Sequence, residues 1–252
     1  MPRGLKLQGR SAPRPLLPPA LRGTAALVVT GCAVVTASLG LAFAGQSRPA
    51  ALDAAVDAHV RSGLGPYEER LRLLAKLGGQ VPFAVLTAAL ILACLATRRW
   101  RGAVLAGVAV PGAVALTEYV LKPLVGRTIL SGYDCYPSGH TTALFSLATT
   151  CAVLLTGAAR PRLPGAMRLL LVLAAALIAA GVAASMVARG YHYFTDIIGG
   201  TAVGIGMVLL TALVIDWTAD SARARSLLRH ADGTQAATAP DVTIESPGPV
   251  GR

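Results

Sequence analysis

The chain has 252 residues, of which 54% are hydrophobic and only 14% charged, and its mean hydropathy is +0.60. This charged share is well below that of ordinary soluble domains, so the composition excludes a typical water-soluble fold and indicates a membrane protein. A net charge of +11 in a soluble protein would suggest nucleic acid binding. Here the arginines flank long apolar runs, so membrane topology explains the charge and no nucleic acid partner is expected.

Residues 1–23 contain five basic side chains, many prolines and no acid, which predicts a disordered basic arm. A cleaved signal peptide is the alternative. The apolar run that follows is longer than a typical signal core, which favours an uncleaved membrane anchor.

Apolar runs of about 20 residues recur along the chain, the length that a helix needs to cross roughly 30 Å of hydrocarbon. They predict an all-α polytopic membrane protein with six transmembrane helices in a bundle, within residues 24–217. The runs cover about residues 24–45, 79–97, 102–121, 139–157, 167–188 and 197–217.

Residues 46–78 mix both charge signs and repeat apolar side chains at helical spacing, including Leu52, Val56, Val60 and Leu64. This pattern predicts amphipathic helices lying at the membrane interface, with a plain solvated loop as the alternative. At the other end, residues 218–252 lose the apolar pattern and turn to Ala, Ser, Thr, Asp, Pro and Gly. They predict a disordered C-terminal tail.

The basic residues divide unevenly between the two sides of this six-span map, with 15 Lys and Arg on the side of the termini and 8 on the other. By the positive-inside rule, both termini are predicted to be cytoplasmic. The loops bearing Lys122, His140 and His192 are then extracytoplasmic, in a multi-pass protein of the cell membrane.

A polar segment, Tyr136-Pro137-Ser138-Gly139-His140-Thr141-Thr142, interrupts the apolar pattern before the fourth run. Ser138 and Gly139 are small enough to let backbone N–H groups approach an anion. The following run is expected to be a helix, whose positive N-terminal end would face that anion. A phosphate group suits this position.

The remaining polar side chains of the middle of the sequence converge on the same predicted outer side. His192 and Asp196 are four residues apart, so Asp196 is expected to accept a hydrogen bond from one imidazole nitrogen and leave the other as a nucleophile. His140 could then protonate a leaving oxygen. The positive charge that a transferring phosphoryl group needs would come from Lys122, Arg127 and Arg189.

Taken singly, each of these residues has a plainer interpretation. Lys122 or Arg127 could mark topology at the interface, His192 could simply be solvated, and Asp196 could cap the sixth span. Ser138-Gly139 could be an ordinary turn. Their joint placement on one side favours the catalytic interpretation.

Glu118 lies four residues before Lys122, near the outer end of the third span, where an uncompensated carboxylate is costly. It is predicted to support Lys122; contact with interfacial water is the alternative. Among the grouped residues only Asp196 is otherwise acidic, so no metal and no cofactor is expected. The four cysteines show neither a disulfide framework nor zinc spacing.

These residues resemble the motifs of the type 2 phosphatidic acid phosphatase superfamily of membrane lipid phosphatases. Its Pro-Ser-Gly-His motif is intact at Pro137–His140. Its third motif keeps the spacing of Ser185, His192 and Asp196, although Met186 occupies the arginine position. In its first motif Lys122 matches, whereas Ile129 and Leu130 replace Arg-Pro. The resemblance covers about residues 79–217.

The resemblance implies a metal-free phosphatase built on a six-helix bundle. It implies a phosphohistidine on His192, oriented by Asp196, with His140 as general acid. Phosphate would be held by Lys122, Arg127, Ser138, Gly139 and Arg189. Arg127 and Arg189 lie near the positions of the missing family arginines, and we expect them to carry the phosphate-binding role from these shifted positions.

The substrates implied are lipid phosphates such as phosphatidate, diacylglycerol pyrophosphate or polyprenyl pyrophosphate, with membrane lipids as the other partners. Two alternatives remain at this point. One is a phosphotransferase that passes the group to an acceptor other than water, and the other is a catalytically impaired scaffold, suggested by the two missing arginines. The sequence specifies neither the lipid tail nor the oligomeric state.

Overall fold

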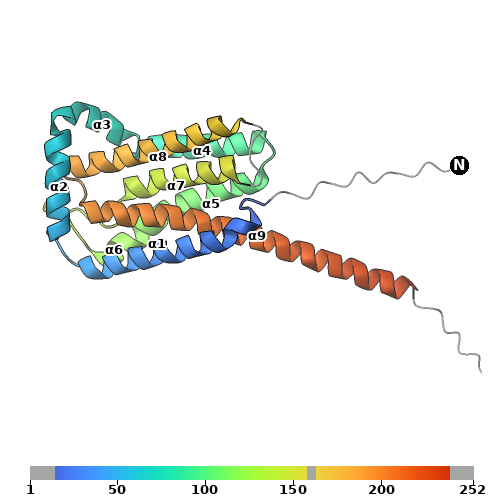
Figure 1. Cartoon of the computed structure of the whole chain (residues 1–252). Coiled ribbons are helices and arrows are strands. Elements are labelled where there is room, and N and C mark those ends of the chain that lie inside the picture. The colour runs from blue at the N-terminus through green and yellow to red at the C-terminus, as the bar shows by residue number, and fades with distance from the viewer. Residues whose placement is uncertain (1–14, 158–162, 239–252) are drawn as a thin grey trace, which may run out of the picture. The chain divides into compact units, whose positions relative to one another are not determined.

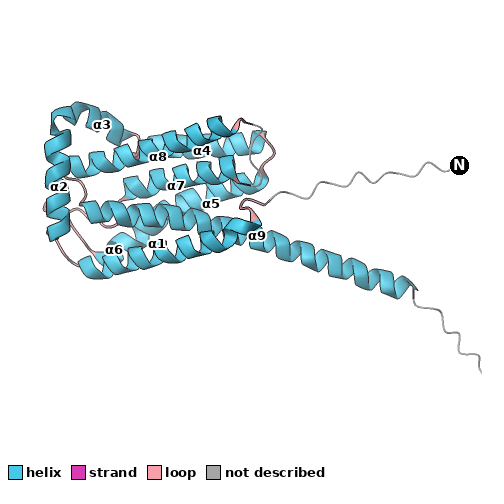
Figure 2. Cartoon of the chain, viewed as in Figure 1, coloured by secondary structure: helices cyan, strands magenta, loops and turns pink. Residues whose placement is uncertain are grey.

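The computed structural model describes residues 15–157 and 163–238. This part of the chain is predominantly helical, with helices joined by loops, and contains no β-strand, which confirms the all-α prediction (Figure 2). It divides into two units, one ending at Asp216 and the other beginning at Trp217. Among the described residues the second unit contains only the C-terminal part of the last helix.

All six predicted apolar runs form helices. By length and composition, five of the described helices can cross a membrane, and a sixth crossing results if Ala51–Lys76 and Gln80–Ala96, bent by 49°, count as one span. The chain is therefore a polytopic membrane protein. The six helices are α1 (Arg22–Phe43), α4 (Gln80–Ala96), α5 (Trp100–Leu116), α7 (Gly139–Thr156), α8 (Gly165–Ala188) and α9 (Phe194–Thr238).

The end of α5 changes its helical geometry where the polar residues begin. A π-helical turn, η3 (Thr117–Leu121), joins α5 to the short α6 (Lys122–Val125). Gly126 then ends α6 in the left-handed conformation, at φ +60°, which glycine adopts without strain. π-Helical turns are frequent at functional sites, and this one carries Glu118.

Helix α7 lies in the core of the bundle and packs against α5 and α8. It also meets α9 closely, because α9 has a glycine facing it. A Cβ on Gly200 would lie only 2.5 Å from the carbonyl oxygen of Ser138. Small residues at such contacts let membrane helices approach each other closely, and here the contact fixes the start of α7 against the start of α9.

Helix α2 (Ala51–Leu64) runs across the ends of the spanning helices, and α3 (Glu68–Lys76) follows it after the short helix η2 (Gly65–Tyr67) (Figure 1). The predicted amphipathic helices are therefore present, and the solvated-loop alternative is wrong. The inward face of α2 differs from the prediction, however. Leu52 is 55% exposed, whereas Asp53 and Asp57 are buried.

The N-terminal segment is ordered where the sequence predicts disorder. Leu16 and Leu17 are buried, and their backbone N–H groups donate to the two carboxylate oxygens of Asp216, each at 2.9 Å. This buried carboxylate on α9 gains stabilisation from the two bonds, which tie the segment to the bundle. Residues 1–14 of the predicted arm lie outside the described residues.

The C-terminal tail also differs from its prediction. Helix α9 continues to Thr238, well past residue 217, although the apolar pattern ends there. The described part of the predicted tail is therefore helical. Residues 239–252 lie outside the described part of the chain.

The charge split predicts the orientation of the bundle, and single cysteines can test it. Tyr133, between α6 and α7, is 73% exposed, and Thr97, between α4 and α5, is exposed at the opposite end. In intact cells, a membrane-impermeant thiol reagent should label Tyr133→Cys but not Thr97→Cys, which should react only after lysis. The opposite pattern would reverse the orientation. The native Cys135 should stay unlabelled in both backgrounds because it is buried.

Candidate active site

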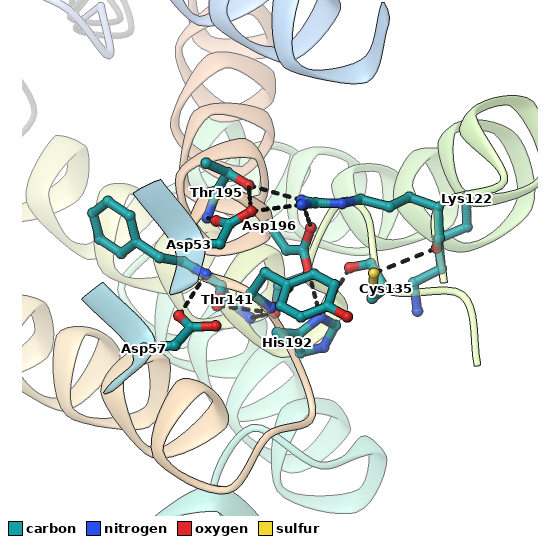
Figure 3. Close-up of polar contacts among 12 residues, drawn as sticks. Asp53, Asp57, Lys122, Cys135, Thr141, His192, Thr195 and Asp196 are labelled. Atoms are coloured by element: carbon teal, nitrogen blue, oxygen red, sulfur yellow. Dashed lines mark hydrogen bonds and ion pairs between the residues drawn. The ribbon is translucent and has the colours of Figure 1, made fainter. Parts of the chain in front are cut away.

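His192 lies in the short connection between α8 and α9, with its side chain buried. Its Nδ1 is 2.8 Å from the carbonyl oxygen of Cys135 (Figure 3). Because a carbonyl oxygen can only accept a hydrogen bond, Nδ1 carries the proton in this contact. The lone pair is then on Nε2, which is the tautomer that a nucleophilic imidazole needs.

Asp196 does not make the hydrogen bond to His192 that the sequence predicts. Its Oδ2 is 3.7 Å from Nδ1 of His192, beyond hydrogen-bond distance, and instead accepts from the backbone N–H of Tyr193 at 2.8 Å. The carbonyl of Cys135 therefore sets the tautomer. Asp196 places a negative charge near the imidazole and also stabilises the first turn of α9.

Arg127 is fully buried and does not face the opening of the site. Its Nη1 donates to Oδ1 of Asp196 at 2.6 Å and to the hydroxyl of Thr195 at 2.7 Å, and its Nη2 donates to Asp53 at 2.6 Å. The prediction that Arg127 binds phosphate does not agree with this geometry, because both terminal nitrogens are occupied and the one nitrogen without a partner, Nε, belongs to a fully buried side chain.

The surroundings of Arg127 keep its charge in place. The guanidinium carbon lies 4.1 Å from the ring centre of Phe43 and 4.8 Å from that of Tyr193. Burial acts to lower the pKa of Arg127, but Asp196 and Asp53 outweigh it and raise the pKa above its usual value. The ionised state of this buried group is thus the stable one.

Ser138 and Gly139 begin α7 as predicted, with Ser138 as its N-cap. The Ser138 hydroxyl oxygen accepts from the N–H of Thr141 at 3.4 Å, while its own N–H donates to the Asp196 carbonyl at 3.1 Å. Ser138 is thus a buried cap whose hydroxyl oxygen accepts hydrogen bonds. Its contact with phosphate stays a prediction. Gly139 and His140 are the first two residues of the helix, whose N–H groups have no partner one turn earlier in α7.

Lys122 and Glu118 form an ion pair at the same helix start. The Lys122 Nζ is 2.7 Å from the Glu118 carboxylate, and the two side chains are 16% and 36% exposed. A Cβ added to Gly139 would collide with the Glu118 carboxylate and lie 3.9 Å from Nζ of Lys122. His140 interacts electrostatically with His192 as well as with this pair. Glu118, Lys122, Gly139 and His140 are all partly exposed and lie near one another.

Arg189 ends α8 and lies close to His192 in the sequence. Its Nη2 donates to the hydroxyl of Tyr191 at 3.0 Å, and its guanidinium stacks on that ring. Its Nε and Nη1 are buried without a hydrogen-bond partner, so both could donate to an anion. Met186, at the position of the family arginine, is buried in an apolar cluster. Whether Arg189 replaces the missing arginine stays a prediction.

Two carboxylates from α2 were missed by the sequence analysis. Asp53 accepts from the N–H of Thr195 at 2.8 Å, and Asp57 accepts from the N–H of Phe194 at 3.1 Å. The signal was available: two aspartates four residues apart in a largely apolar helical pattern, which places both on one face. Their partner could not be found in the same way, because it lies about 140 residues further along the chain.

Cys135 contributes to the site through its backbone carbonyl, which contacts Nδ1 of His192. Its thiol is buried, lies 3.4 Å from the carbonyl of Arg127, and has a raised pKa because of burial and the charge of Asp196, so it is a protonated, unreactive group. Within residues 15–157 and 163–238, no group of three or more His, Cys, Asp or Glu side chains is arranged to hold a metal ion.

Fold and site together define a polytopic membrane protein with a histidine-centred polar site at the start of two helices. A sequence profile of the PAP2 superfamily matches residues 83–220, more than half of the chain, and the chain therefore belongs to that superfamily. This is a phosphatase family, so membership supports a phosphoric ester hydrolase in a membrane. Comparisons with curated proteins and with solved structures gave no significant match.

Gly139→Ala should lower the rate of lipid phosphate hydrolysis by at least about tenfold, which corresponds to about 1.4 kcal/mol. The reason is that the added methyl group displaces Glu118 and with it Lys122. Gly107→Ala in α5 is the matched control, since its Cβ would meet its nearest atom at an ordinary 3.6 Å. Wild-type kcat/KM in folded Gly139→Ala protein would contradict the assignment of this helix start to the site.

Proposed function

We propose that this protein hydrolyses a lipid phosphate or pyrophosphate through a phosphohistidine on Nε2 of His192. The observation that carries the proposal is the 2.8 Å contact between Nδ1 of His192 and the Cys135 carbonyl, which leaves Nε2 unprotonated. Membership of a phosphatase superfamily supports the same chemistry.

The reaction has two steps. In the first, the Nε2 lone pair attacks phosphorus, the bond to the leaving oxygen breaks, and protonated His140 gives that oxygen its proton. In the second, water attacks the phosphohistidine, the P–N bond breaks, and His140 takes a proton from the water. Inorganic phosphate leaves and both histidines return to their starting states. The negative charge of Asp196 stabilises the positive charge that His192 acquires during transfer.

Phosphate binding is assigned to the partly exposed basic side chains and to the start of α7. These are the ammonium of Lys122, the two unpartnered nitrogens of Arg189, and the N–H groups of Gly139 and His140. They supply positive charge next to the negatively charged oxygens of the transferring group, so the proposed reaction needs no metal ion. Glu118 holds the Lys122 ammonium in place, and a bound phosphate would compete with the Glu118 carboxylate for that ammonium.

An apolar cavity of about 570 Å³ supports a lipid as the substrate. It lies between α1, the α5–α6 segment and α9, and Thr36 is the only hydroxyl-bearing side chain besides Tyr136 in its lining. Leu121 and Val125 face the cavity, whereas Lys122, next to Leu121 in the chain, pairs with Glu118 at the site. A headgroup at the site and a chain in the cavity would therefore be close neighbours. Phosphatidate, diacylglycerol pyrophosphate and polyprenyl pyrophosphate all fit this description.

Purified protein in detergent should release inorganic phosphate from at least one of these lipids, and chelator should leave the rate unchanged. His192→Gln should abolish release, because the amide is not a comparable nucleophile. Product analysis with added lipid or sugar acceptors separates hydrolysis from phosphotransfer. Transfer without phosphate release would favour a phosphotransferase, and folded wild-type protein inactive on the whole panel would favour a catalytically impaired scaffold.

Filling the cavity should weaken binding of long-chain substrates. Ala33 lines the cavity, so Ala33→Trp should raise KM for a long-chain lipid phosphate by about tenfold and leave kcat on a short-chain analogue unchanged. Val34→Trp is the control, because Val34 is the next residue of α1, is 57% exposed and does not line the cavity. Equal KM values for both variants would remove the cavity from substrate binding.

A further inference from the structure

The superfamily match begins at residue 83, yet α2, which precedes it, contributes to the active site. Asp53 uses both carboxylate oxygens there. Its Oδ1 accepts from the backbone N–H of Thr195, and its Oδ2 accepts from Nη2 of Arg127 at 2.6 Å and from the Thr195 hydroxyl at 3.2 Å. All three side chains are buried, so water does not compete for these bonds.

Arg127 connects Asp53 to both groups that surround Nδ1 of His192. Through its side chain, Arg127 holds Asp196, at 2.6 Å. Through its backbone carbonyl it accepts from the N–H of Cys135 at 2.8 Å, and the Cys135 carbonyl is the acceptor that fixes the His192 ring. Displacement of Arg127 would therefore disturb both the charge beside the nucleophile and the contact that sets its tautomer.

Asp57 offers an internal comparison on the same helix. It lies one turn after Asp53, is equally buried, and likewise accepts from a backbone N–H of α9, that of Phe194. Its other contact is with Arg61 at 3.5 Å, not with Arg127. Burial raises the pKa of Asp57 to about 6, whereas at Asp53 the hydrogen bonds from Thr195 and Arg127 outweigh the effect of burial and lower the pKa. The surroundings favour the ionised state of Asp53 more than that of Asp57.

We propose that Asp53 is a positioning residue for the reaction: by pairing with Arg127 it fixes Asp196 and Cys135, and through them the orientation of His192. The inference rests on the proposed function for its catalytic consequence. Helix α2 is thereby part of the active site and not only a cover over the ends of the spanning helices.

The kinetic test compares Asp53→Asn with Asp57→Asn in purified full-length protein. Asp53→Asn should lower kcat by at least about tenfold and change KM by less than about threefold, because no group that binds phosphate is altered. Asp57→Asn should keep kcat within about twofold of wild type. Arg127→Lys should resemble Asp53→Asn, and the double variant should lose no more than Arg127→Lys alone, because both changes break one chain of contacts.

Thiol protection supplies a readout that does not depend on activity. Cys135 is 1% exposed, and its thiol lies against the carbonyl of Arg127, so its modification rate reports the position of that segment. Asp53→Asn should raise the rate of Cys135 alkylation, measured by mass spectrometry of the peptide, by at least about tenfold, whereas Asp57→Asn should not. Thr195→Val, which removes one hydroxyl from the network, is the second variant in case Asp53→Asn does not fold. It should lower kcat and raise the rate of Cys135 alkylation, each by less than Asp53→Asn.

Equal loss of kcat in the two aspartate variants would overturn the proposal and make α2 a structural cap. So would unchanged kcat in folded Asp53→Asn protein, or a loss confined to KM. If wild-type protein released no phosphate from any lipid tested, the proposed function would fail. In that case Cys135 protection alone decides the inference: exposure specific to Asp53→Asn or Thr195→Val supports the positioning role, and unchanged protection refutes it.

Discussion

A buried guanidinium between two buried carboxylates determines how the polar end of this bundle is built. Removing one partner from such a group typically costs about 3–5 kcal/mol, because the remaining charge is left unpaired in a low-dielectric interior. Arg127 pairs with both Asp53 and Asp196, so its removal would leave two buried carboxylates without their cation. The three charges come from α2, the loop after α6 and the start of α9, so these segments must meet at one point.

The site separates into two kinds of charged group as a result. Arg127, Asp53 and Asp196 are buried and paired, and they hold other groups in place. Lys122 and Glu118 are partly exposed, and Arg189 retains unpartnered donors, so these side chains can respond to an incoming anion. In the proposed mechanism, the buried charges give orientation and the accessible ones give binding, which is the division that a preorganised site for phosphoryl transfer requires.

Much of the fold could be predicted from the sequence, because a helix that crosses a bilayer needs a long apolar run and the runs are visible directly. The structure also brings His192 next to the segment that precedes α7, as the sequence predicts. The role of Arg127 could not be predicted, since nothing local distinguishes an arginine that binds phosphate from one that pairs with distant carboxylates. Asp53 is 74 residues from Arg127 in the chain. The expected bond between His192 and Asp196 assumed a helix through both, but α9 begins at Phe194 and His192 precedes it.

The most direct measurement of the central claim is the identity of the phosphorylated residue during turnover. Protein mixed with a lipid carrying a radioactive phosphate, quenched within the first turnover and digested, should give one labelled peptide containing His192. Its label should be stable in base and lost in acid, as expected for a phosphoramidate. Label on His140 or on a serine, or turnover with no label on the protein under conditions that trap the intermediate, would contradict a mechanism in which Nε2 of His192 is the nucleophile.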